Sequence, residues 1–210
     1  MSVSSSMVMK ITPLAVPGSL ATTAAEIEAL GVRAVPIPMD LADQESVRAA
    51  AAQAHQRLGG PDIVVNNAIR HVPHARLADL TVADLYDSLT ANLVNQVVLV
   101  QELLPAMLAR GGGLIVNMAS GSATTDPTGP AGAGGWGLAY SAAKAGFGRL
   151  AGAINVEYAD RGIRAFNLDP GFVVTESGRA RGGTDQIADQ GFTLAPIDGP
   201  GRCVLWLATS

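Results

Sequence analysis

The sequence has a single cysteine, Cys203, so no disulfide can form within the chain. A chain without disulfides suits a reducing compartment, and we expect a cytoplasmic protein. Charged residues are also scarce, at 15%, and the formal net charge of −4 argues against a nucleic-acid or anionic-membrane surface. Residues 1–20 show no basic leader before an apolar core, and no apolar run approaches the ~20 residues that span a bilayer. We expect no metal site.

Aromatic residues make up only 4% of the chain, yet 48% of its 210 residues are hydrophobic. A chain of this length and composition can bury one sizeable core, so we expect a single domain over residues 1–210. Residues 1–20 are atypical of such a domain, and disorder is one interpretation of them.

Tyr140 and Lys144 lie four residues apart in the run Tyr140-Ser-Ala-Ala-Lys144. On a helix, positions i and i+4 share a face, so the phenol and the ammonium group point into the same space. A nearby positive charge favours the phenolate and lowers a tyrosine pKa from its usual value near ~10. The pair is therefore a candidate general acid and base for an alcohol oxygen. The alternative is an exposed tyrosine beside an unrelated lysine.

Short apolar runs alternate with amphipathic segments along the chain. Strands are expected at 32–38, 61–68, 113–120 and 163–168. Helices are expected at about 22–30, at 44–58 after a cap at Asp43, around Tyr140 to about Arg161, and at 200–208. A further helix is expected to begin at a cap at Thr81. Its apolar stripe consists of Leu85, Leu89, Leu93 and Val97. This alternation predicts an α/β fold, a parallel sheet with helices on both faces, that binds ligands beyond the carboxyl ends of its strands.

Six segments together resemble the short-chain dehydrogenase/reductase family, whose fold is a Rossmann-like doubly wound parallel sheet. They occur in the family's order over roughly residues 20–208, at Asp40-Leu41, 62–68, Asn92-Leu93, 115–120, 140–144 and 170–175. Each is weak alone, but chance assembly of all six is very improbable. The resemblance implies an NAD(P)-dependent oxidoreductase that interconverts an alcohol and a ketone, working on a small molecule as a homodimer or homotetramer.

The resemblance also implies a role for each matching residue. Tyr140 exchanges a proton with the substrate oxygen, and Lys144 lowers the pKa of Tyr140 and binds the nicotinamide ribose. Ser120 donates to the oxygen where negative charge develops, and Asn92 holds a water between Lys144 and solvent. The other expected cofactor contacts are Asp40 and Leu41 at the adenine, Asn67 and Ala68 at the ribose, and Val173 and Thr175, after the Pro170-Gly171 turn, at the carboxamide.

One part of the family pattern is missing. The family opens with a strand, a glycine-rich turn and a helix, whose backbone amides bind the cofactor's pyrophosphate. Nothing before Thr22 fits that turn, and the chain stops at Ser210, just before the family's last strand. The resemblance thus implies a fold truncated at its N-terminal βα unit and its C-terminal strand, with binding of NAD or NADP in doubt. The alternative function is a non-catalytic remnant, or an association partner unable to bind cofactor.

Several residues have other interpretations. Asp40 could cap the following helix, and Asp169 is expected to be a turn residue. Asn66 is expected to tie neighbouring strands, and Asn67 to do this as well as line the site.

Residues in the loop after residue 68 and on the Tyr140 helix also have more than one interpretation. Two histidines in the loop after residue 68, His71 and His74, could touch substrate or be solvated. Ser122 is a possible substitute for Ser120. Three small residues on the Tyr140 helix would let another helix approach closely, which agrees with the expected oligomer; they are Ala139, Ala143 and Gly146.

Overall fold

The computed structural model describes residues 19–175 and 193–210. The expectation of disorder near the N-terminus falls on residues 1–18 and so lies outside the described residues. The described elements are α1 (Leu20–Ala29), α2 (Gln44–Leu58), β1 (Ile63–Asn66), α3 (Val82–Leu89), the π-helical turn η1 (Thr90–Val94), α4 (Asn95–Ala109), β2 (Gly113–Met118), the 3-10 turn η2 (Gly121–Ala123), α5 (Leu138–Tyr158), the 3-10 turn η3 (Ala159–Arg161), β3 (Ile163–Leu168) and α8 (Gly199–Thr209).

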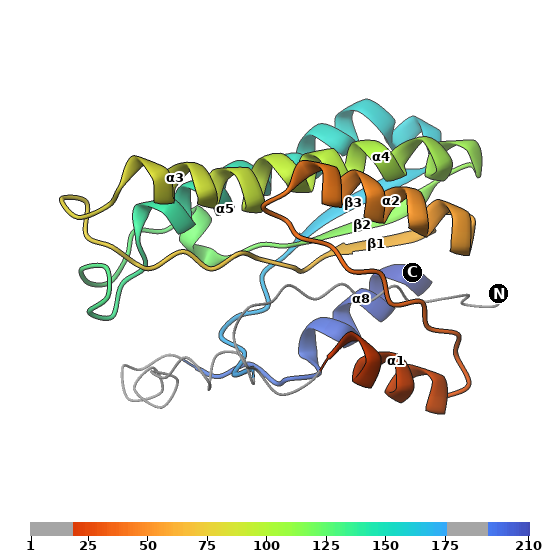
Figure 1. The fold of residues 1–210 in the computed structure, drawn as a ribbon, viewed down its shortest axis with the longest axis horizontal. Coiled ribbons are helices and arrows are strands. Elements are labelled where there is room, and N and C mark those ends of the chain that lie inside the picture. Colours follow the sequence, from red (N-terminus) through yellow and green to blue (C-terminus); the bar gives the residue numbers. More distant parts are fainter. Residues whose placement is uncertain (1–18, 176–192) are drawn as a thin grey trace.

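The three described strands form one parallel sheet in the order β1-β2-β3. Figure 1 shows α2, α4 and α5 on one face of this sheet and α1 and α8 on the other. Parallel strands joined by helical crossovers on two faces are the expected Rossmann-like α/β architecture, and that prediction is confirmed.

Local capping residues set several helix ends as predicted. The Asp43 side chain accepts from Glu45 N at the start of α2, and Gly59 ends that helix in a left-handed conformation with φ 77°. Thr81 accepts from Asp84 N at the start of α3. Because Asp43 is the cap, the alternative role of Asp40 as a helix cap is wrong.

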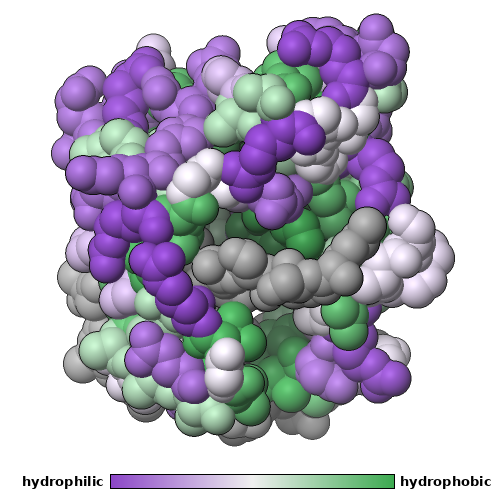
Figure 2. Space-filling model, turned by 90° about the vertical axis from the view of Figure 1, so that its right-hand side faces the viewer, coloured by the Kyte–Doolittle hydropathy of each residue, from purple (hydrophilic) through white to green (hydrophobic). Residues whose placement is uncertain are grey.

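The main core lies on the α2, α4 and α5 face of the sheet. Val64, Ile115 and Ala165 point to this face and pack against buried residues of α2 and α4 such as Val47 and Leu103. Side chains alternate along a strand, so the neighbouring positions point toward α1 and α8. There Val65 is 41% exposed and Phe166 is 37% exposed. Figure 2 shows hydrophobic surface between the two layers of the molecule.

Of the strand predicted at 32–38, the described part of the chain shows one bridge residue, Ala34, and no longer ladder. Val35, Ile37 and Met39 are buried in the core in alternation with more exposed neighbours, as in a strand. However, a strand needs a ladder partner, and Pro36 and Pro38 have no backbone N–H to donate. The hydrophobic pattern therefore predicted which residues are buried, while β-bridging within the described residues is limited to Ala34.

The predicted stripe along the helix from Thr81 is confirmed only in part. Leu85, Leu89, Leu93 and Val97 are only half-buried. The most buried positions of α3 and η1 include Ser88, Ala91 and Asn92 instead. The π-helical turn widens the helix by one residue per turn and rotates the later residues relative to the earlier ones. A regular 3.6-residue pattern therefore cannot give the buried face.

Residues 82–109, which run through α3, η1 and α4, are long and apolar enough to cross a membrane by length and composition. The expectation that no apolar run has this length is therefore wrong. Over the most apolar stretch of this segment 56% of residues are buried inside the protein, and α4 lies against the sheet and α2 in Figure 1. The segment has the properties of a core helix.

Candidate functional site

Lys144 is buried at the carboxyl end of the sheet. It is 8% exposed, and its Nζ donates a 2.6 Å hydrogen bond to the carbonyl of Met118, the last residue of β2. Nζ also lies 5.4 Å from the centre of the Phe147 ring, in cation–π geometry. Tyr140 precedes Lys144 by about one turn of α5 and is half-buried. The i and i+4 spacing is thus on a helix, as predicted.

Burial changes the charge behaviour of Lys144. Desolvation lowers the pKa of Lys144 to about 8, and the negative charge of Asp169 acts in the opposite direction. The ammonium therefore stays mostly protonated at neutral pH. Asp169 is also the expected turn residue, because its Oδ1 accepts a 3.0 Å hydrogen bond from Gly171 N. Its electrostatic effect on Lys144 was not predicted from the sequence.

Ser120 follows β2 on the same edge of the sheet and is half-buried. The buried Ser122 donates its hydroxyl to Ser120 Oγ at 3.0 Å, and Ser122 N also donates to this oxygen. Since Ser120 Oγ accepts both bonds, its own proton is free to be donated outward. This arrangement favours Ser120 as the donor and gives Ser122 a supporting position.

Asn92 lies in the π-helical turn and is 4% exposed. Its amide makes a double hydrogen bond with the backbone of Arg70, accepting from Arg70 N at 2.8 Å and donating to Arg70 O at 2.9 Å. The side chain therefore fixes the loop that follows β1. Its expected role in holding a water stays a prediction.

Three asparagines cross the sheet in register at this end. Asn167 donates to Gly148 O on α5, Asn117 donates to Asn167, and Asn66 donates to Asn117. A carbonyl can only accept, so Gly148 O sets the direction of the whole chain and leaves the buried Oδ1 of Asn66 without a donor.

The interstrand role of Asn66 is therefore confirmed. Asn67 is exposed, and its side chain makes no hydrogen bond to a neighbouring strand within the described ranges 19–175 and 193–210. The expectation that Asn67 also ties strands together is wrong.

The residues expected to contact the adenine and the ribose differ in how exposed they are. Asp40 is exposed, and its Oδ1 accepts from Ala42 N in a local turn. Leu41 is fully buried in the core, which does not favour contact between its side chain and an adenine. Ala68 is half-buried, and its carbonyl accepts from Gln96.

The segment after β3 returns to the same edge. Gly171 has φ 65°, a conformation that favours glycine, and an added Cβ would lie 3.3 Å from the Cβ of Ala195. Val173 is half-buried and Thr175 is exposed. Pro170 and Gly171 thus form the expected turn beside Lys144 and Asp169.

His74 also lies at this edge, against α5. Its Nδ1 accepts a 3.1 Å hydrogen bond from Gly137 N, and its ring meets the Tyr140 ring edge-on at 5.7 Å between centres. His74 remains exposed on the surface, and its partial burial against α5 lowers the pKa of its imidazole. A loop histidine 63 residues before its partner carries no sequence signal for such a contact.

The small residues of α5 serve contacts within the chain. Ala139 and Ala143 are buried, and Ala139 O accepts from Ser88 on α3. An added Cβ at Gly146 would lie 2.7 Å from a methyl group of Leu93. The close helix contact that these small residues allow is therefore made by α3 and η1 of the same chain. These residues carry no evidence for an oligomer.

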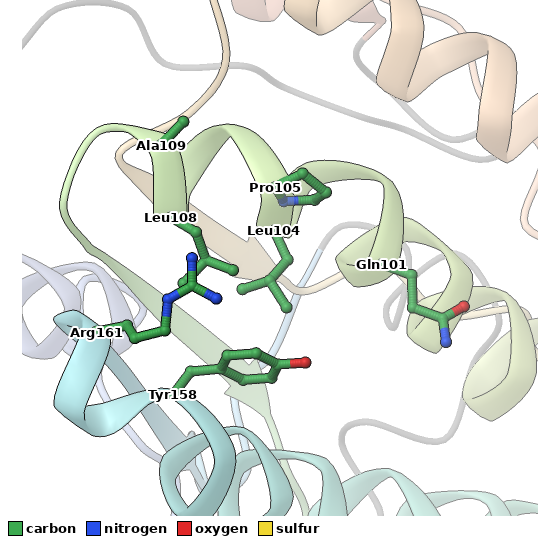
Figure 3. A pocket seen from close by; sticks show the side chains of 7 residues that line it. All are labelled: Gln101, Leu104, Pro105, Leu108, Ala109, Tyr158 and Arg161. Carbon is green, nitrogen blue, oxygen red and sulfur yellow. The ribbon is translucent and has the colours of Figure 1, made fainter.

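A cavity of about 480 Å³ lies far from this site, between α4 and the carboxyl end of α5. In Figure 3 the side chains of Tyr158 and Arg161 extend toward Leu104 and Leu108 of α4. Tyr158 is 18 residues, or about 27 Å of helix, beyond Tyr140. This cavity is therefore separate from the candidate catalytic residues.

The family model for short chain dehydrogenases matches residues 12–185. The chain belongs to the short-chain dehydrogenase family. It is 37% identical over 142 residues to D-threitol dehydrogenase of Mycolicibacterium smegmatis, which covers 66% of this chain and 50% of that protein. It is 31% identical to 2-(R)-hydroxypropyl-CoM dehydrogenase of Xanthobacter autotrophicus, over 75% of this chain and 61% of the relative.

Solved structures of short-chain dehydrogenases have the same fold. The gluconate 5-dehydrogenase of Burkholderia cenocepacia, in complex with NADP and tartrate, has a TM-score of 0.73 at 26% identity, over 88% of this chain and 72% of its own. The L-sorbose reductase of Gluconobacter frateurii has a TM-score of 0.75 at 24% identity, over 88% and 74% of the two chains, and shows the fold alone. The chain spans about half the length of the curated relatives it matches.

Proposed function

We propose that this chain is an NAD(P)-dependent oxidoreductase that interconverts an alcohol and a ketone by hydride transfer, with Asn92, Ser120, Tyr140 and Lys144 as its catalytic set. The observation that carries the proposal is the buried ammonium of Lys144, held by Met118 O about one helical turn from Tyr140. Burying a charged group is costly, so an enzyme function gives a reason for its presence.

Each member of this set has a distinct task. Tyr140 passes its phenol proton to the substrate oxygen during reduction and takes it back during oxidation. The protonated Lys144 stabilises the phenolate that remains. Ser120, whose oxygen is already an acceptor for Ser122, donates its proton to the substrate oxygen. Asn92 keeps the loop after β1 in place through Arg70.

The nicotinamide cofactor supplies the hydride, and the described residues fit one end of it. Lys144 and the Pro170-Gly171 turn lie together at the strand ends, where a nicotinamide ribose and carboxamide would bind. For the pyrophosphate, no strand in the described part of the chain is followed by a glycine-rich turn that opens a helix. We therefore expect NAD or NADP to bind more weakly than in a family member that has this turn.

The substrate is proposed to be a small alcohol or ketone. Similar proteins whose names refer to D-threitol and gluconate make polyhydroxy compounds the first class to test. The gluconate 5-dehydrogenase structure with NADP makes NADPH the first cofactor to test. A homodimer or homotetramer is proposed from the family, and its size can be measured by light scattering.

Titration of the purified protein with NADPH and NADH, followed by nicotinamide fluorescence, tests the proposal. Binding in the micromolar range, retained in Tyr140→Phe, together with reduction of a ketone by the unchanged protein only, would support it. A folded protein that binds neither cofactor would favour the alternative, a non-catalytic remnant or association partner. The exposed Val65 and Phe166 of the sheet are the observation that favours this second function, because another molecule could cover them.

A further inference from the structure

The first turn of α5 has an unusual arrangement at its N-terminus. Gly137 is the N-cap and has no side chain that could cap the helix. The first four N–H groups of a helix lack partners within the helix, and the N-cap N–H is commonly satisfied by a Glu or Gln side chain at the third helical position. In α5 that third position is Tyr140. The local sequence thus has no acceptor to offer.

His74 supplies the missing acceptor from another loop. Its Nδ1 accepts from Gly137 N at 3.1 Å, and a backbone N–H can only donate, so Nδ1 carries no proton. The imidazole is therefore neutral and protonated on Nε2. A positive charge would also be unfavourable at the N-terminus of a helix. Burial, which lowers the pKa of His74, acts in the same direction.

The same ring also contacts Tyr140. The two rings are 5.7 Å apart between centres and nearly perpendicular, at 86°. Close backbone packing holds the loop in this place, since an added Cβ at Gly137 would lie 3.3 Å from His74 Cα and an added Cβ at Gly132 would lie 3.4 Å from His74 O. One side chain thus contacts both the first turn of α5 and the Tyr140 ring on it.

We propose that His74 is a positioning residue for Tyr140, which it orients by accepting from Gly137 N and by packing its ring edge-on against the phenol. This inference rests on the proposed function, in which Tyr140 transfers the proton. A shift of about 1 Å in a reacting group can cost about a hundredfold in rate, so this orientation affects turnover directly.

Two substitutions separate the two contacts. His74→Asn keeps an oxygen acceptor for Gly137 N and removes the ring, whereas His74→Phe keeps a ring and removes the acceptor. By NMR, hydrogen exchange at the Gly137 amide should accelerate about five- to tenfold in His74→Phe and change little in His74→Asn, as expected for the loss of one helix cap. The ring resonances of Tyr140 should move most in His74→Asn.

In turnover, both variants should lose roughly ten- to a hundredfold in kcat with little change in KM. Arg76→Gln, an exposed change two residues along the same loop, is the matched control and should leave all three readouts unchanged. Unchanged Gly137 exchange and Tyr140 resonances in both variants would overturn the inference, as would unchanged kcat. Because the NMR readouts need no substrate, a protein without turnover would count against the proposed function and leave the contacts of His74 separately testable.

Discussion

On the face of the sheet that α2, α4 and α5 cover, Ile115, Ile163 and Ala165 are at most 2% exposed, whereas Val65 and Phe166 on the opposite face are 41% and 37% exposed. Among the described residues, α8 has no buried residue and α1 has only Ala24. Val116, which pairs in register with Val65 and Phe166, is 0% exposed, so on the α1 and α8 side the central strand is covered and the flanking strands are loosely covered (Figure 1).

The candidate catalytic residues belong to the packed side. Lys144 lies on α5 and Asn92 on the π-helical turn between α3 and α4, and both are buried. A site that must hold side chains within a fraction of an ångström needs such rigid support. We expect changes on the loosely covered side to leave these residues in place. Four predictions test this division, from the largest expected effect to the smallest.

Tyr140→Phe on the packed side should lower turnover by about a hundred- to ten-thousandfold, because it removes the proton that general acid catalysis needs. The melting temperature should stay within a few degrees of the unchanged protein, since only one oxygen is lost. Tyr158→Phe, the same change at the other end of α5, is the control and should keep full turnover. Steady-state kinetics and circular dichroism check both, and full turnover in Tyr140→Phe would refute the mechanism.

Leu103→Ala and Leu205→Ala make the same chemical change on opposite sides of the sheet. Leu103 is 1% exposed in α4, and its loss should cost about 2–5 kcal/mol of unfolding free energy through lost burial and a cavity. Leu205 is 62% exposed in α8, and its loss should stay within about 0.5 kcal/mol. Urea denaturation measures both, and equal costs would mean that the two sides are packed alike.

Lys144→Met should stabilise the fold while abolishing turnover. Burial lowers the pKa of Lys144 from 10.5 to about 8, so the folded protein holds this proton less tightly than the unfolded chain. Below pH 8 both states are protonated and the full cost of the buried charge is present, at most about 3 kcal/mol. The cost declines as pH rises from 8 toward 10.5, so the advantage of the variant should shrink over that range.

Thermal melts of Lys144→Met across this pH range, compared with Arg149→Met, measure the effect. Arg149 is exposed on the same helix, so its replacement should give no comparable trend with pH. A constant difference between Lys144→Met and the unchanged protein would show that burial does not lower the pKa of Lys144.

Trp206→Ser on the loosely covered side should change unfolding free energy by less than about 0.5 kcal/mol, because this side chain is 66% exposed. If another molecule covers this face, the same change should weaken self-association in sedimentation velocity. The control variant is Val156→Thr, which changes an 88% exposed position of α5 on the outer surface of the other layer. If both variants and the unchanged protein self-associate equally, no second copy of the chain binds this face.

Local signals in the sequence predicted the parts of the fold that depend on a few neighbouring residues. Asp43 and Gly59 bound α2 as expected, and β3 spans the predicted residues 163–168, because caps and short β-branched runs act over one or two turns. The stripe from Leu85 to Val97 is only half-buried because the π-helical turn alters the period in the middle of the helix. In the strand predicted at 32–38 only Ala34 forms a bridge among the described residues, because strand pairing depends on a partner that the pattern does not specify.

For the site, the spacing in the sequence placed Tyr140 and Lys144 on one helix and placed Ser120 at a strand end. The contacts that give these residues their properties join distant parts of the chain. Met118 is 26 residues from Lys144, Arg70 is 22 from Asn92, and His74 is 63 from Gly137. No periodicity or local motif encodes such pairs.

The sequence by itself determined the family, the α/β order of elements and the residue types able to move a proton, because these follow from short-range pattern and side-chain chemistry. Only the tertiary structure decided that Lys144 is buried on a backbone carbonyl, that Asn92 clamps the loop after β1, and that His74 caps the helix of Tyr140. These depend on how the sheet and helices pack, since burial and hydrogen-bond partners across the fold exist only once distant segments are brought together.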